Sequence, residues 1–533
     1  MASTAAVPPG GSRDLFVRNA TGLVRELNAF DAFNLVFSAV LIPVGITQVM
    51  GFTPQFWPHA NMLVSFLIAT PLVLCFGLVY LYFTILMPRS GGDYVWVSRT
   101  LHPSLGFLVN FSLTFVFLTW VAFNFTFMLS VVGPAAAYVL GIHNHWFLAP
   151  TKNEMMLVST ILTAAFAALM IFGVRVVARY MAATFAVVWL GMGAWIIAML
   201  VGGHSHFIST WNAKSGTTYD KVISTAEHYG FNAGGGIAWG ATLFAMVYCF
   251  QVYTGFQWTG YFAGEIKNAR RTAVTSILGG LFASALIYMI GVALIYHYYG
   301  FKFFGSLVWL GLGGGTAHYT LGFSPYLAAL ANFLPGPHWL AGFIAISFVL
   351  AILWWTPTGF MLGTRNVFAW SFDRLAPARL TEVSDRFHTP VMATVFVALI
   401  VELLNYLNIY QGLGAFLLNI IAVMGGAFII VSVAAMLAPF LRRDLHAQAP
   451  AWAARRVAGV PTITLIAAVS AAAWAFVIWT AFHTGFGGAI GWKPMIKAFT
   501  APIIAIIWYV AVWAYRRSQG IDLSRTFHEI PPE

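Results

Sequence analysis

Long apolar runs separated by short polar segments constrain this chain more than any other feature of its sequence. Twelve runs are long enough to cross a bilayer, because a transmembrane helix needs about 20 apolar residues. They lie at 30–53, 60–87, 106–139, 154–173, 180–202, 237–262, 273–298, 338–364, 390–408, 413–441, 461–482 and 498–515. Only 8% of the 533 residues are charged, against about 25% in soluble proteins. The sequence therefore predicts an all-α polytopic membrane protein with twelve transmembrane helices.

Basic residues are distributed unevenly between the two sides of this predicted bundle. With the N-terminus inside, the inner segments hold all 20 arginines and Lys267, and the outer segments hold the other six lysines. Arginine and lysine accumulate on the cytoplasmic side of membrane proteins. We therefore predict a multi-pass protein of the plasma (inner) membrane with both termini in the cytoplasm. The net charge of +11 follows from this topology, and we predict no nucleic-acid partner.

Two apolar runs contain residues that interrupt helices. Pro43 and Gly45 stand inside the first run, and Thr254 and Gly255 stand inside the sixth. Proline removes a backbone donor, and glycine leaves helical geometry at little cost. Paired interruptions in the two halves of a chain indicate the substrate site of a transporter. The alternative is that both are simple kinks, which membrane helices tolerate.

Three separated stretches resemble amino acid permeases of the amino acid–polyamine–organocation superfamily. PRSGGDYVWVSRTLHPSLGFL at 88–108 is similar to the loop that follows the second span of that family. FQVYTGFQWTGYFAGEIKNARR at 250–271 is similar to its sixth span, with Gly255 and Glu265 at the family's spacing of ten. GTRNVFAWSFDRLAPARL and RFHTP, within 363–390, are similar to the segment after the eighth span.

The resemblance implies a leucine-transporter-like fold, with two inverted repeats of five helices, of which helices 1 and 6 are broken. The predicted parts are a cytoplasmic tail at 1–29, a first repeat at 30–202, an extracellular loop at 203–236, a second repeat at 237–441, peripheral helices at 442–515 and a cytoplasmic tail at 516–533. The apolar segment 324–334 is too short to span and predicts a short helix, either over the outer mouth or on the surface.

The same resemblance places a substrate site at the two interruptions. Backbone amides near 43–45 would hold a carboxylate, since the start of a half-helix attracts anions, and carbonyl groups near 250–253 would accept from an ammonium. The family has glycine at the position of Pro43 and glutamate at that of Gln257, so one amide and one acid are missing here. The predicted substrate-binding residues are Pro43, Val44, Gly45, Ile46, Thr47, Phe123, Asn124, Phe250, Tyr253, Thr254, Gly255, Phe256, Gln257 and Trp354.

Acids and arginines of the inner loops suggest a cytoplasmic gate. Arginines of these loops, Arg99 among them, could pair with the acids and hold the inner side closed; the alternative is that they only set the topology. The residues predicted for the gate are Arg89, Asp93, Glu265, Arg365 and Asp373. Glu402 lies inside the ninth run, and we expect a paired or snorkelling side chain there rather than a proton relay.

The coupling ion is left open between H⁺ and Na⁺. Some proton-coupled relatives carry a lysine where Trp189 stands here. Sodium would need oxygen ligands, which Thr356 and Thr358 beside Pro357 could supply. The alternative for these hydroxyls is a bond back to their own helix. No cofactor and no other metal site is predicted.

The most consistent function is secondary active transport of amino acids by alternating access. The candidate site contains no carboxylate, which favours a neutral or apolar amino acid as the substrate. The alternatives are transport of another small organic solute, such as an amine or organic cation, and ligand binding by a nutrient sensor without transport. No cluster of histidine, cysteine or acids shares one membrane depth, so we do not expect an enzyme. The predicted partners are a small-molecule substrate and the lipid bilayer.

Overall fold

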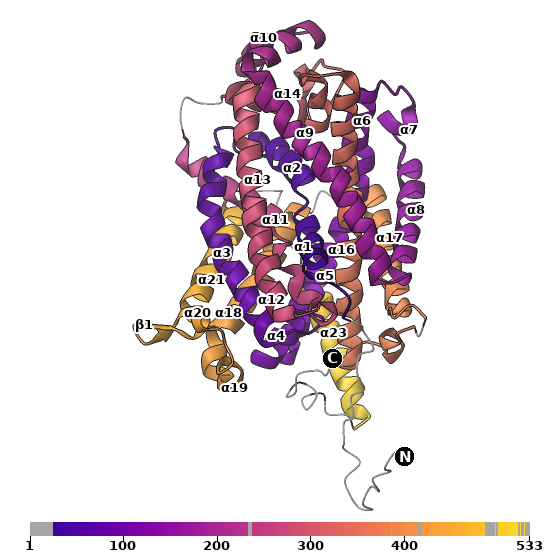
Figure 1. Cartoon of the computed structure of the whole chain (residues 1–533), viewed down its shortest axis with the longest axis vertical. Coiled ribbons are helices and arrows are strands. Elements are labelled where there is room, and N and C mark those ends of the chain that lie inside the picture. The colour runs from indigo at the N-terminus through magenta and orange to yellow at the C-terminus, as the bar shows by residue number, and fades with distance from the viewer. Residues whose placement is uncertain are drawn as a thin grey trace, which may run out of the picture.

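The computed structural model describes residues 25–232, 237–384, 386–412, 417–484, 496, 499–520, 523 and 527, and most of them are helical. The long helices run side by side along one axis (Figure 1). In the first half they are α1 (Ala29–Val40), α2 (Ile42–Phe56), α3 (Met62–Leu86), α4 (Asp93–Thr100), α5 (Pro103–Phe127), α6 (Gly133–Leu140), α7 (His145–Leu148), α8 (Lys152–Ile171), α9 (Val174–Lys214), α10 (Tyr219–His228), α11 (Trp239–Tyr253), α12 (Ala269–Ala273) and α13 (Gly279–Ile295).

The second half continues the bundle. Its helices are α14 (Phe301–Leu312), α15 (Leu327–Leu330), α16 (His338–Phe372), α17 (Val391–Gln411), α18 (Leu417–Leu441), α19 (Arg443–His446), α20 (Ala451–Ala454), α21 (Thr462–His483) and α23 (Thr500–Ser518). The 3₁₀ turns are η2 (Phe256–Tyr261), η3 (Ala263–Glu265), η6 (Thr316–His318), η7 (Ala331–Phe333) and η8 (Ala378–Thr381), and the π turns are η1 (Met128–Val132), η4 (Val274–Leu278) and η5 (Tyr296–Gly300). The strands β1 (Arg456–Val457) and β2 (Val460–Pro461) form a small antiparallel hairpin.

Ten helical stretches of the described residues are long and apolar enough to cross a membrane. They are Ala29–Phe56, Met62–Leu86, Pro103–Leu140, Lys152–Ile171, Val174–Lys214, Ala269–Leu312, His338–Phe372, Val391–Gln411, Ile420–Leu441 and Thr462–His483. The predicted spans 237–262 and 498–515 correspond to α11 and α23, which are not among the ten; α11 has only 15 residues. The count of twelve spans therefore stays a prediction, as do the tails 1–29 and 516–533, which lie largely outside the described residues.

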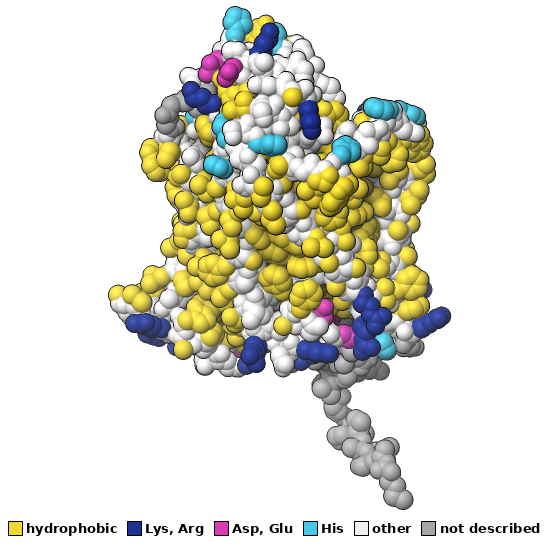
Figure 2. Space-filling view, turned by 45° about the horizontal axis from the view of Figure 1, so that its top comes forward, with side chains coloured by type: hydrophobic (Ala, Val, Ile, Leu, Met, Phe, Trp, Pro, Cys, Tyr) yellow, Lys and Arg dark blue, Asp and Glu magenta, His cyan; other side chains and the backbone are white. Residues whose placement is uncertain are grey.

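The surface of the bundle matches a membrane environment. On the face shown in Figure 2, a broad belt of hydrophobic side chains covers the bundle, and lysine and arginine gather along the lower rim. The helices α4, α12 and α19 lie at this same end (Figure 1), which we call the arginine-rich end. Large apolar side chains such as Leu190, Val201 and Leu399 are more than half exposed on the belt (67%, 76% and 66%), as lipid-facing residues can be.

The first interruption lies at Leu41, between α1 and α2. Leu41 has left-handed backbone angles, with φ 49° and ψ 48°, and its amide bonds back to the carbonyl of Ser38 at 2.9 Å. Pro43 is the second residue of α2, where a helix has no partner for an amide. Proline therefore starts the second half-helix instead of weakening it. The break stands two residues before the predicted position.

The second interruption separates α11 from the turns that follow. Thr254 leaves the helical region with ψ 124°, and Gly255 has φ 136°. The two interruptions are neighbours in space, because a Cβ atom at Gly255 would lie 2.6 Å from the carbonyl carbon of Ala39 in α1. Glycine is required here both by its backbone angle and by this close approach.

A helical cap covers the opposite end of the bundle (Figure 1). Part of the predicted loop 203–236 is helical, since α9 continues to Lys214 past a non-helical Gly203, and α10 follows. Tyr219 at the start of α10 stacks on Phe303 of α14, with ring centroids 4.5 Å apart. The short helix expected at 324–334 forms α15 and η7, and its apolar residues are buried.

Replacing Gly255 with alanine tests the contact between the two interruptions. The new Cβ atom would collide with Ala39, and alanine is strained at φ 136°. We expect Gly255→Ala to lower the unfolding free energy by about 2–5 kcal/mol, the sum of backbone strain and overpacking. The midpoint of thermal unfolding in detergent measures this. Gly240→Ala in α11 is the control, since nothing lies within 4 Å of its Cβ position; equal midpoints for the two variants would contradict the close contact.

Candidate functional site

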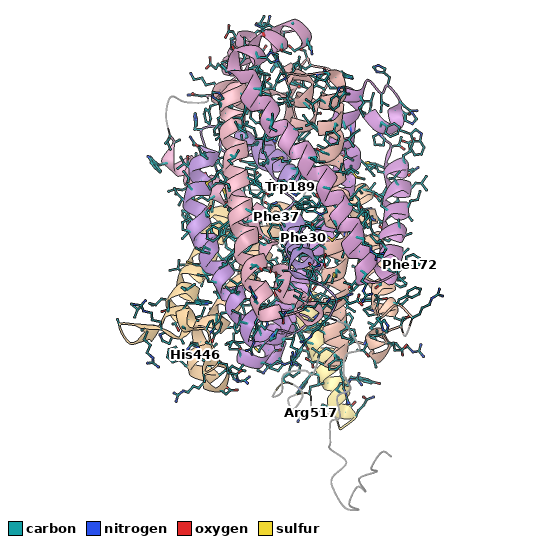
Figure 3. The ribbon with its side chains drawn as sticks, viewed as in Figure 1. Phe30, Phe37, Phe172, Trp189, His446 and Arg517 are labelled. Carbon is teal, nitrogen blue, oxygen red and sulfur yellow. The ribbon has the colours of Figure 1, made fainter. Side chains whose placement is uncertain are left out.

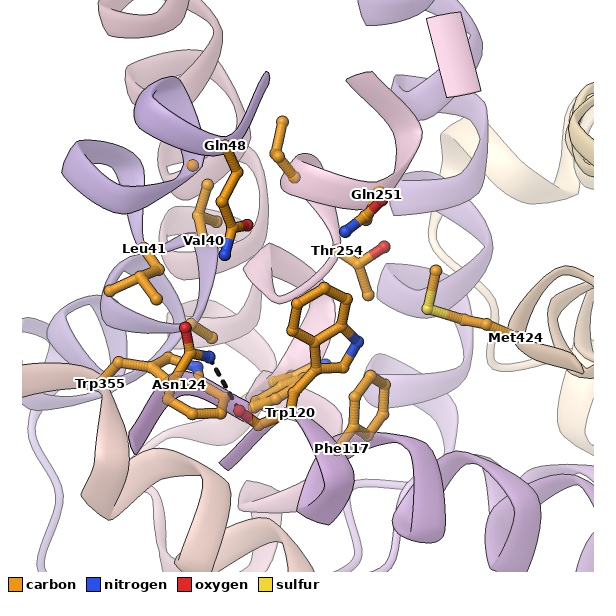
Figure 4. A pocket seen from close by; sticks show the side chains of 14 residues that line it. Val40, Leu41, Gln48, Phe117, Trp120, Asn124, Gln251, Thr254, Trp355 and Met424 are labelled. Carbon is orange, nitrogen blue, oxygen red and sulfur yellow. Dashed lines mark hydrogen bonds between the residues drawn. The ribbon is translucent and has the colours of Figure 1, made fainter. Parts of the chain in front are cut away.

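A cavity of about 60 Å³ lies between the two interruptions. Helix ends and neighbouring helices contribute its walls: α1 and α2, α5, α11, η2, α16 and α18. The lining residues are Ala39, Val40, Leu41, Gly45, Gln48, Phe117, Trp120, Asn124, Gln251, Val252, Thr254, Trp258, Trp355 and Met424. Gln48 and Gln251 enter the cavity from one side, and Trp120 and Phe117 from the other (Figure 4).

Four buried polar atoms at this cavity lack a hydrogen-bond partner among the described residues. They are two donors, Gln48 Nε2 and Trp258 Nε1, and two acceptors, Asn124 Oδ1 and Gln251 Oε1. The amide of Asn124 is oriented by its Nδ2, which donates to the carbonyl of Trp120 at 2.9 Å (Figure 4). A buried polar atom without a partner costs about 1–3 kcal/mol. A ligand that offers both donors and acceptors would therefore be stabilised here.

The helix ends add a polarity of their own to the cavity. At the start of α2, Gly45 is the first residue whose amide bonds to a carbonyl of the preceding turn, that of Leu41 at 2.8 Å. Helix geometry therefore leaves the amides of Ile42 and Val44 without an intrahelical partner. The carboxyl ends of α1 and α11, with Val40 and Val252, carry partial negative charge. No Asp, Glu, Lys or Arg is among the described lining residues, so the site is neutral with separate positive and negative ends.

The structure brings only some of the predicted substrate-site residues to the cavity. Gly45, Asn124 and Thr254 line it. Trp354 does not: its Nε1 donates to Asn34 Oδ1 at 2.9 Å, while the next residue, Trp355, lines the cavity.

Other predicted residues have structural partners. Gln257 accepts through Oε1 from the amide of Gly255 at 2.9 Å and so caps the interruption. Tyr253 bonds Thr70 through its hydroxyl at 2.8 Å, and Phe123 stacks on Phe127. The remaining members lie in α2, α11 and η2 without lining the cavity: Pro43, Val44, Ile46, Thr47, Phe250 and Phe256.

Sequence reasoning missed several lining residues that lie one helical turn from a predicted one. Gln48 follows Gly45 by three positions, Gln251 precedes Thr254 by three, and Trp120 precedes Asn124 by four. Residues three or four apart share a helix face. Extending each predicted residue by one turn would have identified these three.

A comparison with protein-family models places this site in a known family. Residues 38–521 match the model described as amino acid permease. The chain belongs to the amino acid permease family. A search of curated proteins finds no match. The family transports amino acids, and the match covers both interruptions and the cavity; with its apolar helices, this permease is a multi-pass membrane protein with a small-molecule substrate.

Buried ion pairs connect helices at the arginine-rich end of the permease. Arg365 of α16 contacts Glu265 of η3 with two bonds, Nε–Oε1 at 2.5 Å and Nη2–Oε2 at 2.7 Å. Arg99 of α4 contacts Asp373 at 2.7 Å, and Tyr94 donates to the same carboxylate at 2.8 Å. All these side chains are at most 5% exposed. The pairs tie the segment after the second interruption, and α4, to the end of α16.

The other two predicted gate residues have different partners. Asp93, the first residue of α4, accepts hydrogen bonds from Tyr80 at 2.9 Å, from Asn110 at 2.6 Å and from Tyr261. Its partners are thus neutral donors from α3, α5 and η2. Arg89 donates to the carbonyl of Pro88 at 3.3 Å. Asp93 therefore lies in the same layer as the ion pairs, but none of its partners in these contacts is an arginine.

The two threonines considered for ion coupling each have a hydrogen-bond partner inside the protein. Thr356 bonds back to the carbonyl of Ile352 at 2.8 Å, the alternative considered for it. Thr358 contacts the hydroxyl of Ser38 at 2.8 Å and the carbonyl of Leu35 at 3.4 Å. These three oxygens, from α1 and α16, are of the type that Na⁺ accepts.

The other two residues considered for coupling, Trp189 and Glu402, are partly buried and have partners. Trp189 stacks on Phe37 of α1, with ring centroids 4.9 Å apart (Figure 3). Glu402 of α17 is paired with polar groups: it accepts from Thr160 of α8 and from Asn405 at 3.2 Å.

The ion pair between Arg365 and Glu265 gives a stability prediction. Arg365→Met leaves Glu265 buried without its partner, which we expect to lower the unfolding free energy by about 3–5 kcal/mol. The double variant Arg365→Met/Glu265→Leu should recover most of this loss in a thermal unfolding assay. Arg175→Met is the control, because Arg175 pairs with Glu26 while its side chain is 76% exposed, and such pairs contribute about 1 kcal/mol or less. Equal losses of unfolding free energy in Arg365→Met and Arg175→Met would contradict a stabilising role of the buried ion pair.

The carboxyl of Asp93 gives a pH prediction. Burial raises its pKa from 3.8 to about 6, so the folded protein binds this proton more tightly than the unfolded chain. The resulting stabilisation, on the order of 3 kcal/mol, is present below about pH 4 and lost as the pH rises through 6. Unfolding midpoints between pH 4 and 7 measure it. In Asp93→Asn this component should be absent, and identical pH profiles for the two proteins would contradict it.

Proposed function

We propose that this permease is a secondary active transporter of neutral amino acids, which works by alternating access at the cavity between the two interruptions. The observation that carries the proposal is the set of four partnerless polar atoms, two donors and two acceptors, in a cavity without an ionised side chain. A zwitterion matches such a site, because it has no net charge but needs donors at one end and acceptors at the other.

The carboxylate and the ammonium of the amino acid would bind at opposite sides of the cavity. The carboxylate would accept from Gln48 Nε2, in the amino-terminal half of α2. The ammonium would donate to Gln251 Oε1 and Asn124 Oδ1, near the carboxyl ends of α1 and α11. The cavity of about 60 Å³ favours a small side chain. The apolar surface of Leu41, Phe117 and Met424 supports a substrate without side-chain charge.

Alternating access requires one side to be closed while the other opens. The buried pairs Arg365–Glu265 and Arg99–Asp373 support an arginine-rich end that is closed in this conformation. We propose that this end faces the cytoplasm of a plasma-membrane protein with both termini cytoplasmic, in keeping with the positive-inside rule. Ten spans in two inverted repeats of five, with α11 and η2 as the broken sixth span, and two peripheral spans would complete the mechanism. The driving ion is H⁺ or Na⁺.

A second candidate function is transport of an organic cation. Four aromatic rings line the cavity, those of Phe117, Trp120, Trp258 and Trp355. Aromatic faces attract cations. The absence of a lining carboxylate among the described residues favours the zwitterion over the cation.

Transport into proteoliposomes tests the proposal. A panel of labelled amino acids, with amines and organic cations as the comparison, is offered under a proton gradient and a sodium gradient imposed separately. We expect uptake of small neutral amino acids that one of the two gradients accelerates. Uptake of amines alone would establish the second candidate, and binding without uptake would establish a sensor.

The side-chain amides of Gln48 and Gln251 give a transport prediction. Gln48→Leu and Gln251→Leu each remove one hydrogen bond to a charged end of the substrate, which is worth about 1.5–3 kcal/mol. We expect the KM for uptake to rise about 10-fold to 100-fold in each variant. Gln55→Leu is the control, because Gln55 lies in the same helix α2 outside the cavity and bonds the carbonyl of Gly51. An unchanged KM in Gln48→Leu and Gln251→Leu would contradict this site.

A further inference from the structure

A buried tyrosine connects the two interruptions from behind the cavity. Tyr288 of α13 is 0% exposed. Its hydroxyl lies 3.0 Å from the carbonyl oxygen of Val40 and 3.5 Å from that of Val252. Val40 is the last residue of α1, Val252 is the last but one of α11, and both line the cavity. One side chain therefore contacts the carboxyl ends of both half-helices.

The chemistry of this contact is a shared hydrogen. A phenol has one O–H donor, and here it faces two carbonyl acceptors that belong to the last turns of their helices, where intrahelical donors are missing. Each carbonyl oxygen has two lone pairs. The hydroxyl can use one lone pair of either carbonyl, and the others stay available to a donor inside the cavity.

The position of the hydroxyl is tightly fixed. The ring of Tyr288 stacks on Phe66, with centroids 5.0 Å apart and planes 12° apart, and meets Tyr253 edge-on at 5.8 Å. Gly45 of α2 lies against it, since a Cβ atom at Gly45 would collide with the hydroxyl oxygen. The same side chain thus touches the start of α2 as well as the ends of α1 and α11.

We propose that Tyr288 is a positioning residue for the amino group of the substrate. Its hydroxyl holds the carbonyl groups of Val40 and Val252 at the spacing at which their free lone pairs accept from the ammonium. This inference rests on the proposed function, because it concerns the ammonium end of the amino acid. It adds a residue outside the cavity to the groups that select the ligand.

Tyr288→Phe tests the proposal, because it removes the hydroxyl and keeps the ring between Phe66 and Tyr253. Tyr298→Phe is the matched control: Tyr298 is equally buried and donates to the carbonyl of Phe333 at 2.9 Å, away from the cavity lining. The measurements are the KM for the best neutral amino acid, the inhibition constants of its amine without the carboxyl group and of its carboxylic acid without the amino group, and the thermal midpoint.

We expect Tyr288→Phe to raise the KM and the inhibition constant of the amine about tenfold, and to leave that of the carboxylic acid within twofold. Tyr298→Phe should change none of the three. Equal weakening of amine and acid in Tyr288→Phe, or no weakening of either, would overturn the positioning role. Uptake by the wild-type protein tests the proposed function separately, so a transporter with an unaltered Tyr288→Phe variant refutes this inference alone.

Discussion

The structure depends on satisfying backbone groups where two helices are interrupted inside an apolar bundle. Lipid supplies no hydrogen bonds, so each freed amide and carbonyl needs a partner from the protein. Leu41 bonds Ser38, and Gly255 bonds the side chain of Gln257. Tyr288 reaches carbonyl groups of both half-helices. These bonds satisfy backbone groups at the two interruptions. The polar groups at the cavity that still lack a partner are available to a ligand.

The sequence predicted the interruptions well but the lining of the site only in part. Proline, glycine and threonine mark helix breaks in a sequence, so the breaks were located to within about two residues. Trp354 was predicted for the site, but Trp355 lines the cavity, because adjacent residues point about 100° apart on a helix. Only the rotation of α16 against its neighbours decides which ring faces inward. Gln48 and Gln251 were missed for the same reason, although their spacing from Gly45 and Thr254 places them on the predicted faces.

The layer at the arginine-rich end shows the same limit. The motifs around Glu265 and Arg365 brought two residues one hundred positions apart into one hypothesis, and they form an ion pair. Asp93 was assigned to the same gate as a charged partner, but its carboxylate is held by two tyrosines and an asparagine. Neutral partners leave no charge pattern in a sequence. Their identity follows from how α3, α5 and η2 pack around α4.

The side chain of Gln257 has a consequence for energetics across the membrane. It caps the interruption at Gly255 with an uncharged amide, where the resembling permeases have an acid. With neutral lining residues and the proposed zwitterionic ligand, the loaded and the empty site would carry the same net charge. A charge that crosses the bilayer exchanges about 2.3 kcal/mol with each 100 mV of membrane potential. Under the proposed function, the substrate site itself would therefore move no net charge through that potential.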